Sequence, residues 1–124
     1  MEVLAVTKGV RMSPLKVRAV ARQIQGMHAL EAQALLASVP RKSARLVSKT
    51  LKSAMANAEN IADEWDTEEL QGRIAELEQT MLYIKEATVG DAPTMKRWRP
   101  RARGSASPIL KRSCHIRIVL TDQI

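Results

Sequence analysis

The sequence has one cysteine, two histidines and no long apolar run. Because Cys114 has no partner cysteine, an intrachain disulfide and a zinc site built from cysteines are excluded, which fits a reducing compartment. No apolar stretch reaches the ~20 residues that a membrane-spanning helix needs, and the N-terminal residues show no signal-peptide pattern. We therefore expect a cytoplasmic protein that does not enter a membrane.

Groups that could carry out catalysis or hold a metal do not gather in the sequence. His28 and His115 each stand alone, without another ligand at metal-binding spacing. There is no glycine-rich phosphate loop, no nucleophile elbow and no motif of paired carboxylates. We therefore expect a protein that is not an enzyme and that needs no metal or other cofactor.

Acidic residues are absent from residues 94–117. The nine cations and three anions of residues 81–124 give this part of the chain +6 of the net charge of +7. Arginine forks match phosphate oxygens, and a local excess of positive charge attracts a polyanion. We therefore predict that the stretch binds nucleic acid, with a solvated basic loop as the alternative. Its eight cations are Lys96, Arg97, Arg99, Arg101, Arg103, Lys111, Arg112 and Arg117.

The chain is also poor in aromatic residues, with two tryptophans, one tyrosine and no phenylalanine. Domains that bind nucleic acid by stacking bases on a sheet present several aromatic side chains. Contacts to phosphates and to the shape of the nucleic acid are therefore the expected mode of binding.

The basic stretch lies between two segments that read as β-strands, residues 82–89 and 114–121. If these strands pair as a hairpin, Thr88 lies near His115 and the chain reverses close to Ala102. Because proline cannot donate to a strand ladder, the connection is expected to form at most an irregular two-stranded ribbon. Residues 90–112 would then be a basic extended hairpin arm. Its prolines are Pro93, Pro100 and Pro108.

Three helices are predicted at about residues 14–25, 29–37 and 41–59, after a short N-terminal strand. Ser13 is expected to cap the first helix with its side chain, and Pro14 suits the first helical position. The expected apolar faces are Val17, Val20, Ala21 and Ile24 in the first helix, Leu30, Ala34 and Leu35 in the second, and Ala44, Val47, Leu51, Ala54, Met55 and Ala58 in the third.

Cations form a separate stripe on the third helix, roughly 140° around the axis from its apolar face at ~100° per residue. Both a polyanion contact and an ordinary solvated face explain this stripe. The first helix carries Arg18 and Arg22 opposite its apolar face, with Lys16 beside them. The third-helix stripe consists of Arg41, Arg45, Lys49 and Lys52.

The charge reverses in residues 59–78, where eight acidic residues accompany one cation, Arg73. A short extra helix is expected here, so residues 62–80 would be an acidic helical insertion in a single domain that spans residues 1–124. Because carboxylates are repelled by phosphates, the insertion is expected to face solvent or another protein.

Six segments, taken together, closely resemble one known family. They are residues 12–18 (MSPLKVR), 54–60 (AMANAEN), 82–87 (LYIKEA), 93–97 (PTMKR), 100–104 (PRARG) and 109–116 (ILKRSCHI). The family that they resemble is that of ribosomal protein twenty-two of the bacterial-type large subunit. The resemblance covers almost the whole chain, and residues 93–116 are its most specific part.

The resemblance implies an α+β fold, in which three helices pack on a small three-stranded antiparallel sheet and a long β-hairpin protrudes. It implies a structural constituent of the large ribosomal subunit that binds several segments of large-subunit rRNA through a basic helix face and the polycationic hairpin. Supporting subunit assembly and lining the nascent-peptide exit tunnel are further implied roles. Neighbouring ribosomal proteins and the nascent peptide would be partners, and no homo-oligomer is expected. The alternative is a nucleic-acid-binding or regulatory interaction domain outside the ribosome.

The residues expected to contact RNA lie on the first helix, on the third helix and on the hairpin. They are Lys16, Arg18, Arg22, Arg41, Arg45, Lys49, Lys52, Lys96, Arg97, Arg99, Arg101, Arg103, Lys111, Arg112, His115 and Arg117. The resemblance places the tunnel-side tip at residues 95–103, where the expected lining residues are Met95, Lys96, Arg97, Trp98, Arg99, Pro100 and Arg101.

Two features depart from the family pattern. About a dozen residues between Asn60 and Leu82 exceed the usual length, and these form the acidic insertion. At the tip, Ser105 stands where arginine is common, and Pro108 follows it. The returning side of the hairpin is therefore expected to make fewer phosphate contacts.

Overall fold

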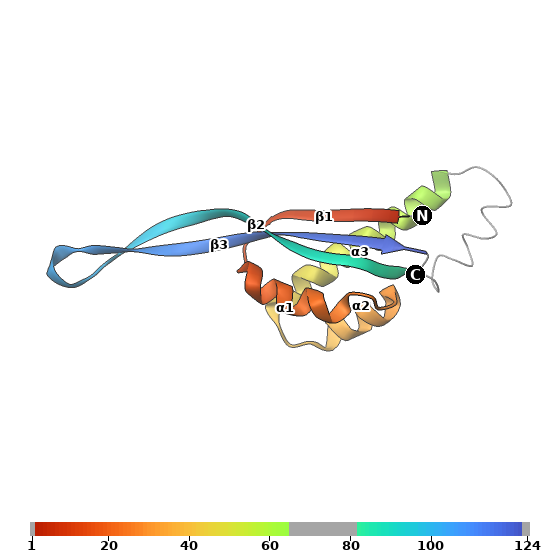
Figure 1. Ribbon diagram of the computed structural model, residues 1–124, viewed down its shortest axis with the longest axis horizontal. Helices are drawn as coiled ribbons and strands as arrows, with labels where there is room; N and C mark the ends of the chain where they lie inside the picture. Colours follow the sequence, from red (N-terminus) through yellow and green to blue (C-terminus); the bar gives the residue numbers. More distant parts are fainter. Residues whose placement is uncertain (1, 65–81, 123–124) are drawn as a thin grey trace.

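The computed structural model describes residues 2–64 and 82–122, and it has the predicted α+β architecture. One end is a body in which helices cover one face of a sheet, and the other end is an arm in which two strands continue alone (Figure 1). The acidic helix expected within residues 62–80 lies outside the described residues, apart from its first positions. In chain order the elements are β1 (Glu2–Val10), α1 (Pro14–Ile24), α2 (Ala29–Ser38), α3 (Lys42–Glu64), β2 (Tyr83–Pro100), a 3-10 turn (Ala102–Gly104) and β3 (Ala106–Thr121).

The sheet has the strand order β1–β3–β2, with β3 antiparallel to both neighbours. Side chains alternate between its faces, so Val3 and Ala5 of β1 are buried while Leu4 between them is exposed. The pairing of β1 with β3 ends where Val10 lies opposite Cys114. Beyond that point β2 and β3 pair only with each other, and this two-stranded part is the arm.

The core lies between the inner face of the sheet and the helices. The predicted apolar faces of α1 and α3 are confirmed, with Met55 only partly buried. Burying an aliphatic side chain contributes about 1.5–3 kcal/mol, so these two faces hold the helices against the sheet. The buried residues are Val17, Val20, Ala21 and Ile24 of α1, Ala44, Val47, Leu51, Ala54 and Ala58 of α3, and Ile84, Ile116, Ile118 and Leu120 of the sheet.

The predicted face of α2 is wrong. Leu30 and Ala34 are exposed and Leu35 is only partly buried, whereas Ala29, Ala32 and Leu36 are buried. Apolar residues occur on most sides of this short helix, so its sequence alone does not determine which side is buried. A contact at the start of α2 decides which face of the helix is buried. The amide of Ala29 donates to the carbonyl of Leu82 at 2.8 Å and holds this end of α2 next to the start of β2.

Two helix ends also differ from the predictions. Ser13 precedes α1 as expected, but its side chain makes no capping hydrogen bond. Its backbone carbonyl instead accepts from the amide of Val17 at 3.3 Å, and the Pro14 ring leaves one amide fewer to satisfy. At the other end, α3 runs to Glu64 rather than stopping at Glu59. Ile61, three residues after the buried Ala58, continues the apolar face of the helix and packs partly buried against the core.

The hairpin is longer and more regular than predicted. Thr88 lies opposite Arg117, and Gly90 takes the place opposite His115, so the predicted register is wrong by two residues. One residue of the error arises at the start of β2, where Tyr83 rather than Leu82 lies opposite Thr121, and the other arises from a register shift between residues 84 and 86. A second shift follows between residues 92 and 95. Each shift places one extra residue in β2, as a β-bulge does.

The prolines and the turn of the arm lie where their chemistry allows. Pro93 falls in the second register shift and Pro100 ends β2, so neither has to donate to the ladder there. The chain reverses at residues 102–104, as predicted, with Arg103 and Gly104 at φ values of 58° and 70°. The amide of Arg101 donates to the carbonyl of Ser105 at 2.7 Å and closes the turn.

Candidate nucleic-acid interface

The cationic stripe predicted on the third helix borders an open groove on the surface. The groove measures about 800 Å³ and lies between the end of α2 and the first turns of α3. Its lining contains five cations and no carboxylate among the described residues. The predicted members Arg41, Arg45, Lys49 and Lys52 are joined there by Lys42, and all five side chains are exposed.

These cations oppose the dipole of their own helix. The first turn of α3 contains no acidic residue, although the positive end of a helix favours negative side chains. Lys42 and Arg45 occupy this turn instead, where a cation destabilises an exposed helix end by roughly 0.3–1 kcal/mol. A bound polyanion would offset this destabilisation, because the free amides at the start of the helix and the nearby cations would both attract its negative charge.

A second basic groove of about 620 Å³ lies at the root of the arm. It is formed where the loop after β1 and the start of α1 meet the last arm residues of β3. The Nη1 atom of Arg11 donates to the carbonyl of Arg112 at 2.7 Å and fixes this meeting. The cations that line the groove are Arg11, Lys16, Lys42, Lys111 and Arg112, again without a carboxylate among the described residues.

Lys42 lines both grooves and makes them one continuous surface. We call this surface the basic band. It joins residues that are far apart in sequence and runs from α3 to the root of the arm. Its members are Arg11, Lys16, Arg41, Lys42, Arg45, Lys49, Lys52, Lys111 and Arg112.

Sequence reasoning missed two members of the basic band, Arg11 and Lys42. Lys42 directly follows Arg41, and the three cations within residues 41–45 at a helix start were the available signal. Arg11 gave no such signal, because its role depends on a carbonyl about a hundred residues away in the chain.

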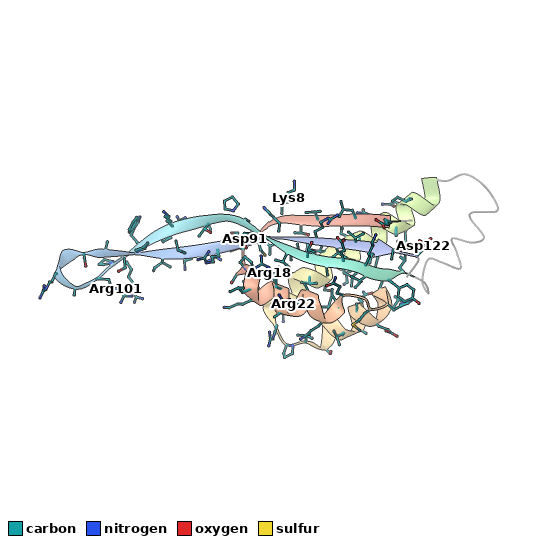
Figure 2. The ribbon with its side chains drawn as sticks, viewed as in Figure 1. Lys8, Arg18, Arg22, Asp91, Arg101 and Asp122 are labelled. Atoms are coloured by element: carbon teal, nitrogen blue, oxygen red, sulfur yellow. The ribbon has the colours of Figure 1, made fainter. Side chains whose placement is uncertain are left out.

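The arm carries the remaining predicted cations into solvent. Every residue from 93 to 106 is exposed, and Arg101 lies near the far end of the arm (Figure 2). No carboxylate of residues 2–64 or 82–122 forms an ion pair with the arm cations Lys96, Arg97, Arg99, Arg101 and Arg103. Their charge is therefore uncompensated within the part of the protein that the structure describes.

Three predicted contact residues have partners elsewhere in the chain, more than thirty residues away. Arg18 donates through Nε to the carbonyl of Val89 at 3.1 Å and through Nη2 to Asp91 at 3.2 Å. The Nδ1 atom of His115 accepts from the amide of Gly9 at 3.0 Å, in the irregular end of β1. These side chains help to hold the root of the arm. Arg22, one turn beyond Arg18 on α1, is exposed and lies outside the basic band (Figure 2).

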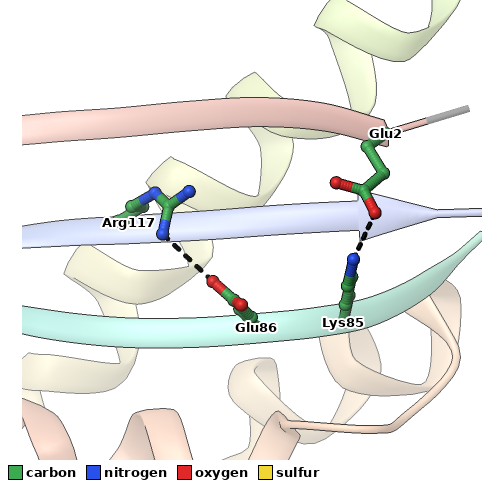
Figure 3. Close-up of polar contacts among 4 residues, drawn as sticks. All are labelled: Glu2, Lys85, Glu86 and Arg117. Atoms are coloured by element: carbon green, nitrogen blue, oxygen red, sulfur yellow. Dashed lines mark hydrogen bonds and ion pairs between the residues drawn. The ribbon is translucent and has the colours of Figure 1, made fainter.

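The third of these residues, Arg117, lies on the outer face of the sheet, where charges are paired. Its Nη1 atom donates to Glu86 at 3.0 Å, and Lys85 pairs with Glu2 across β3 (Figure 3). The Lys85 ammonium lowers the pKa of Glu2, and Glu2 in turn raises the pKa of Lys85. Paired charges attract a polyanion weakly, so the basic band and the arm are the stronger candidates for phosphate contacts.

Groups for other chemistry do not assemble in the described structure. Cys114 is buried, and this burial raises the pKa of its thiol, which makes the residue unreactive. Over residues 2–64 and 82–122, no three metal-ligating side chains come close enough to hold an ion. In the same ranges no helix has the length and apolar character needed to cross a membrane.

Comparison with known proteins identifies a family for this chain. The family described as "Ribosomal protein L22p/L17e" matches residues 5–121. The large ribosomal subunit protein uL22 of Opitutus terrae is 48% identical over 122 residues, which are 98% of this chain and 96% of that protein. The proteins of the same name from Akkermansia muciniphila and Finegoldia magna are 46% and 41% identical, each over 99% of this chain and 98% of the relative.

Proposed function

The chain belongs to the family of ribosomal protein L22p/L17e, and from this premise we propose that it binds large-subunit rRNA through the basic band and the arm. Membership makes it a structural constituent of the large ribosomal subunit in the cytoplasm, with rRNA and other ribosomal proteins as its surroundings. Its role is structural rather than catalytic.

The observation that carries the proposal is the continuity of the basic band. Lys42 connects a groove on α3 with a groove at the root of the arm, and no described carboxylate lines either. Each phosphate that a cation neutralises releases condensed counterions, so a continuous row of cations binds an RNA backbone more strongly than scattered ones. The predicted residues of α3 and of the returning strand thus act on one RNA surface.

The arm extends this contact away from the body. The tip, residues 95–103, would line the exit tunnel of the subunit and meet the passing nascent peptide. Support comes from its shape and charge: residues 93–106 are exposed, and no other strand within residues 2–64 and 82–122 lies beside the arm. A narrow ribbon with cations on it can pass between RNA segments, and holding several segments together would support subunit assembly.

We also propose the division of the chain. Residues 1–124 form a single domain from which residues 90–112 project as the arm, with its root held by Arg18 and Arg11. Residues 62–80 are an insertion whose acidic composition directs it towards solvent or a protein neighbour rather than towards RNA.

The test is the salt dependence of binding to a large-subunit rRNA fragment by the full chain. Lys42→Gln should reduce the slope of log affinity against log salt by about 1, because one phosphate contact is lost. Arg45→Gln with Lys49→Gln should reduce it by about 2 for the same reason. The matched control is Lys8→Gln, which removes one exposed lysine from β1 outside the basic band.

A Lys8→Gln slope that changes as much as the Lys42→Gln slope would mean that only total charge matters and would refute the basic band as the contact surface.

Sedimentation of tagged protein in sucrose gradients tests the cellular role. Stoichiometric protein in large subunits is expected, and mostly free protein would instead support a role outside the ribosome.

A further inference from the structure

The two faces of the arm differ in chemistry. In an antiparallel pair, residues directly opposite each other share a face, and faces alternate along each strand. The observed register therefore divides the arm into two sets of six residues. Met95, Arg97, Arg99, Ser107, Ile109 and Lys111 form a cationic face. Lys96, Trp98, Pro100, Ala106, Pro108 and Leu110 form the other, which we call the tryptophan face.

Side-chain contacts and exposure agree with this division. The Nη2 atom of Arg97 lies 4.0 Å from the Sδ atom of Met95, as expected for neighbours on one face. On the tryptophan face, Trp98 is 66% exposed and Leu110 is 45% exposed, and Pro108 opposite Trp98 is exposed as well. An indole that is 66% exposed gains little from folding, so we look for its partner outside residues 2–64 and 82–122.

The surroundings of Trp98 select the class of partner. Lys96 lies two residues away on the same face, about 7 Å along the strand at ~3.4 Å per residue. Arg97 and Arg99 are its neighbours in sequence and lie on the cationic face of the same ribbon, and no described carboxylate pairs with any of these cations. The partner must therefore combine a flat apolar group with negative charge. A nucleotide carries both in one unit, whereas an apolar peptide carries only the first.

We propose that Trp98 is a stacking platform for an unpaired nucleobase of RNA, with Lys96 beside it for the adjoining phosphate. The inference rests on the proposed RNA-binding function and adds a second kind of contact to it. Pro108 lies across the ribbon from Trp98, at the ~4.5–5.5 Å Cβ separation of a cross-strand pair, and limits the orientations of the indole. Because every base has a π-face, the platform recognises an unstacked base rather than a particular sequence.

The arm would then hold RNA in two ways that respond differently to salt. The cationic face contacts phosphates, so its contribution falls as salt rises. Stacking on Trp98 involves no counterion release, so its contribution persists at high salt. This difference makes the two contacts separable by experiment.

The experiment uses the full chain with Trp65→Phe, so that Trp98 is the only tryptophan. Fluorescence is titrated with two probes, a ten-nucleotide single-stranded RNA of mixed sequence and an oligomer of the same length without bases. The RNA should quench Trp98, and the abasic oligomer should not. Variants at Trp98 lack this fluorophore, so their affinities are measured from the anisotropy of the same two probes carrying a fluorescein label. Trp98→Ala should weaken binding of the RNA by about 5- to 150-fold, the range that base stacking on an aromatic residue spans, and leave the abasic oligomer unaffected.

Conservative variants separate stacking from general apolar packing. Trp98→Tyr keeps a π-face and should retain most of the affinity for the RNA, whereas Trp98→Leu keeps apolar surface only and should lose it. Neither variant should alter the salt slope, while Arg99→Gln should lower that slope for both probes by about 1. Full affinity for the RNA in Trp98→Leu would overturn the proposal, because apolar surface without a π-face would then suffice.

The remaining outcomes are also decisive. Equal binding of both probes, unchanged in Trp98→Ala, would refute the platform and leave the phosphate contacts in place. Failure of the chain to bind either probe at low salt would refute the platform, and failure to bind the large-subunit rRNA fragment as well would refute RNA binding itself. In assembled large subunits, an ultraviolet crosslink from Trp98 to an rRNA base supports the proposal, and crosslinks to protein or nascent peptide alone overturn it.

Discussion

Arg18 joins the first helix to the root of the arm. Its guanidinium reaches the carbonyl of Val89 and the carboxylate of Asp91, so it links α1 to the last residues of β2 before the ribbon stands alone. The sequence places Arg18 and Arg22 together as cations opposite the apolar face of α1, yet the structure gives a partner within the protein to the first of them. Charge pattern alone cannot distinguish these two arginines.

Arg18→Gln should therefore destabilise the protein more than Arg22→Gln. Loss of the hydrogen bond to Val89 and of the ion pair should cost about 1 kcal/mol of unfolding free energy, because the Arg18 side chain is 35% exposed and solvent weakens both contacts. Arg22→Gln, an exposed change on the same helix, should stay within about 0.5 kcal/mol. Urea denaturation measures both, and equal effects would contradict the linking role.

At the scale of single elements, α2 shows how a tertiary contact fixes the phase of a helix. Its residues are mostly alanine and leucine, so several faces are nearly equally apolar. The pairing of residues 26–29 with the start of β2 selects one of them: the amide of Gly26 donates to Ile84 and that of Ala29 donates to Leu82, both at 2.8 Å. The backbone at this pairing needs a φ of 81° at Gly26, and glycine adopts such a value without the steric cost that other residues would have.

Two leucines of α2 test this phase directly. Leu36→Ala removes a side chain that is only 3% exposed and should destabilise the protein by about 2–5 kcal/mol, because it leaves a cavity in the core. Leu30→Ala makes the same chemical change at a position that is 41% exposed and should cost less than about 1 kcal/mol. The comparison again uses urea denaturation, and a larger cost at Leu30 would restore the face that the sequence predicted.

At the scale of the whole molecule, the contacts that stabilise the fold lie in the body, whereas the uncompensated positive charge lies in the arm. The body holds the buried residues and has a third strand and helices around β3. The arm holds uncompensated cations and consists of two strands, and such a ribbon is marginally stable in water on its own. The energy to order the arm has to come from its partner.

Amide hydrogen exchange should show this division. In the free protein, the hydrogen-bonded amides of residues 95–100 and 106–111 should exchange far faster than those of residues 116–120, which lie in the three-stranded part. Addition of cognate rRNA should slow exchange in the arm and leave the body unchanged. Strong protection of the arm without RNA would show that the hairpin is stable by itself and would exclude ordering on RNA.

The arm shows which features of a hairpin can be predicted from the sequence and which cannot. The two strands and the turn near Ala102 follow from local chemistry and are confirmed, although both strands extend further into the arm than predicted and β3 includes Pro108. The predicted pairing of Thr88 with His115, continued outward, would put Trp98 opposite Ser105. A one-residue offset at the start of β2 and the two register shifts within it put Trp98 opposite Pro108 instead, which changes which residues of β3 share its face.

The sequence by itself determined the fold class, the apolar faces of α1 and α3, and the concentration of positive charge in a projecting hairpin. These follow from periodicity and composition, which act over a few neighbouring residues. The tertiary structure alone decided the phase of α2, the joining of two grooves by Lys42, the internal partners of Arg18 and the pairing of Trp98 with Pro108. Each of these depends on contacts between residues far apart in the chain, where one extra residue in a strand changes which side chains meet.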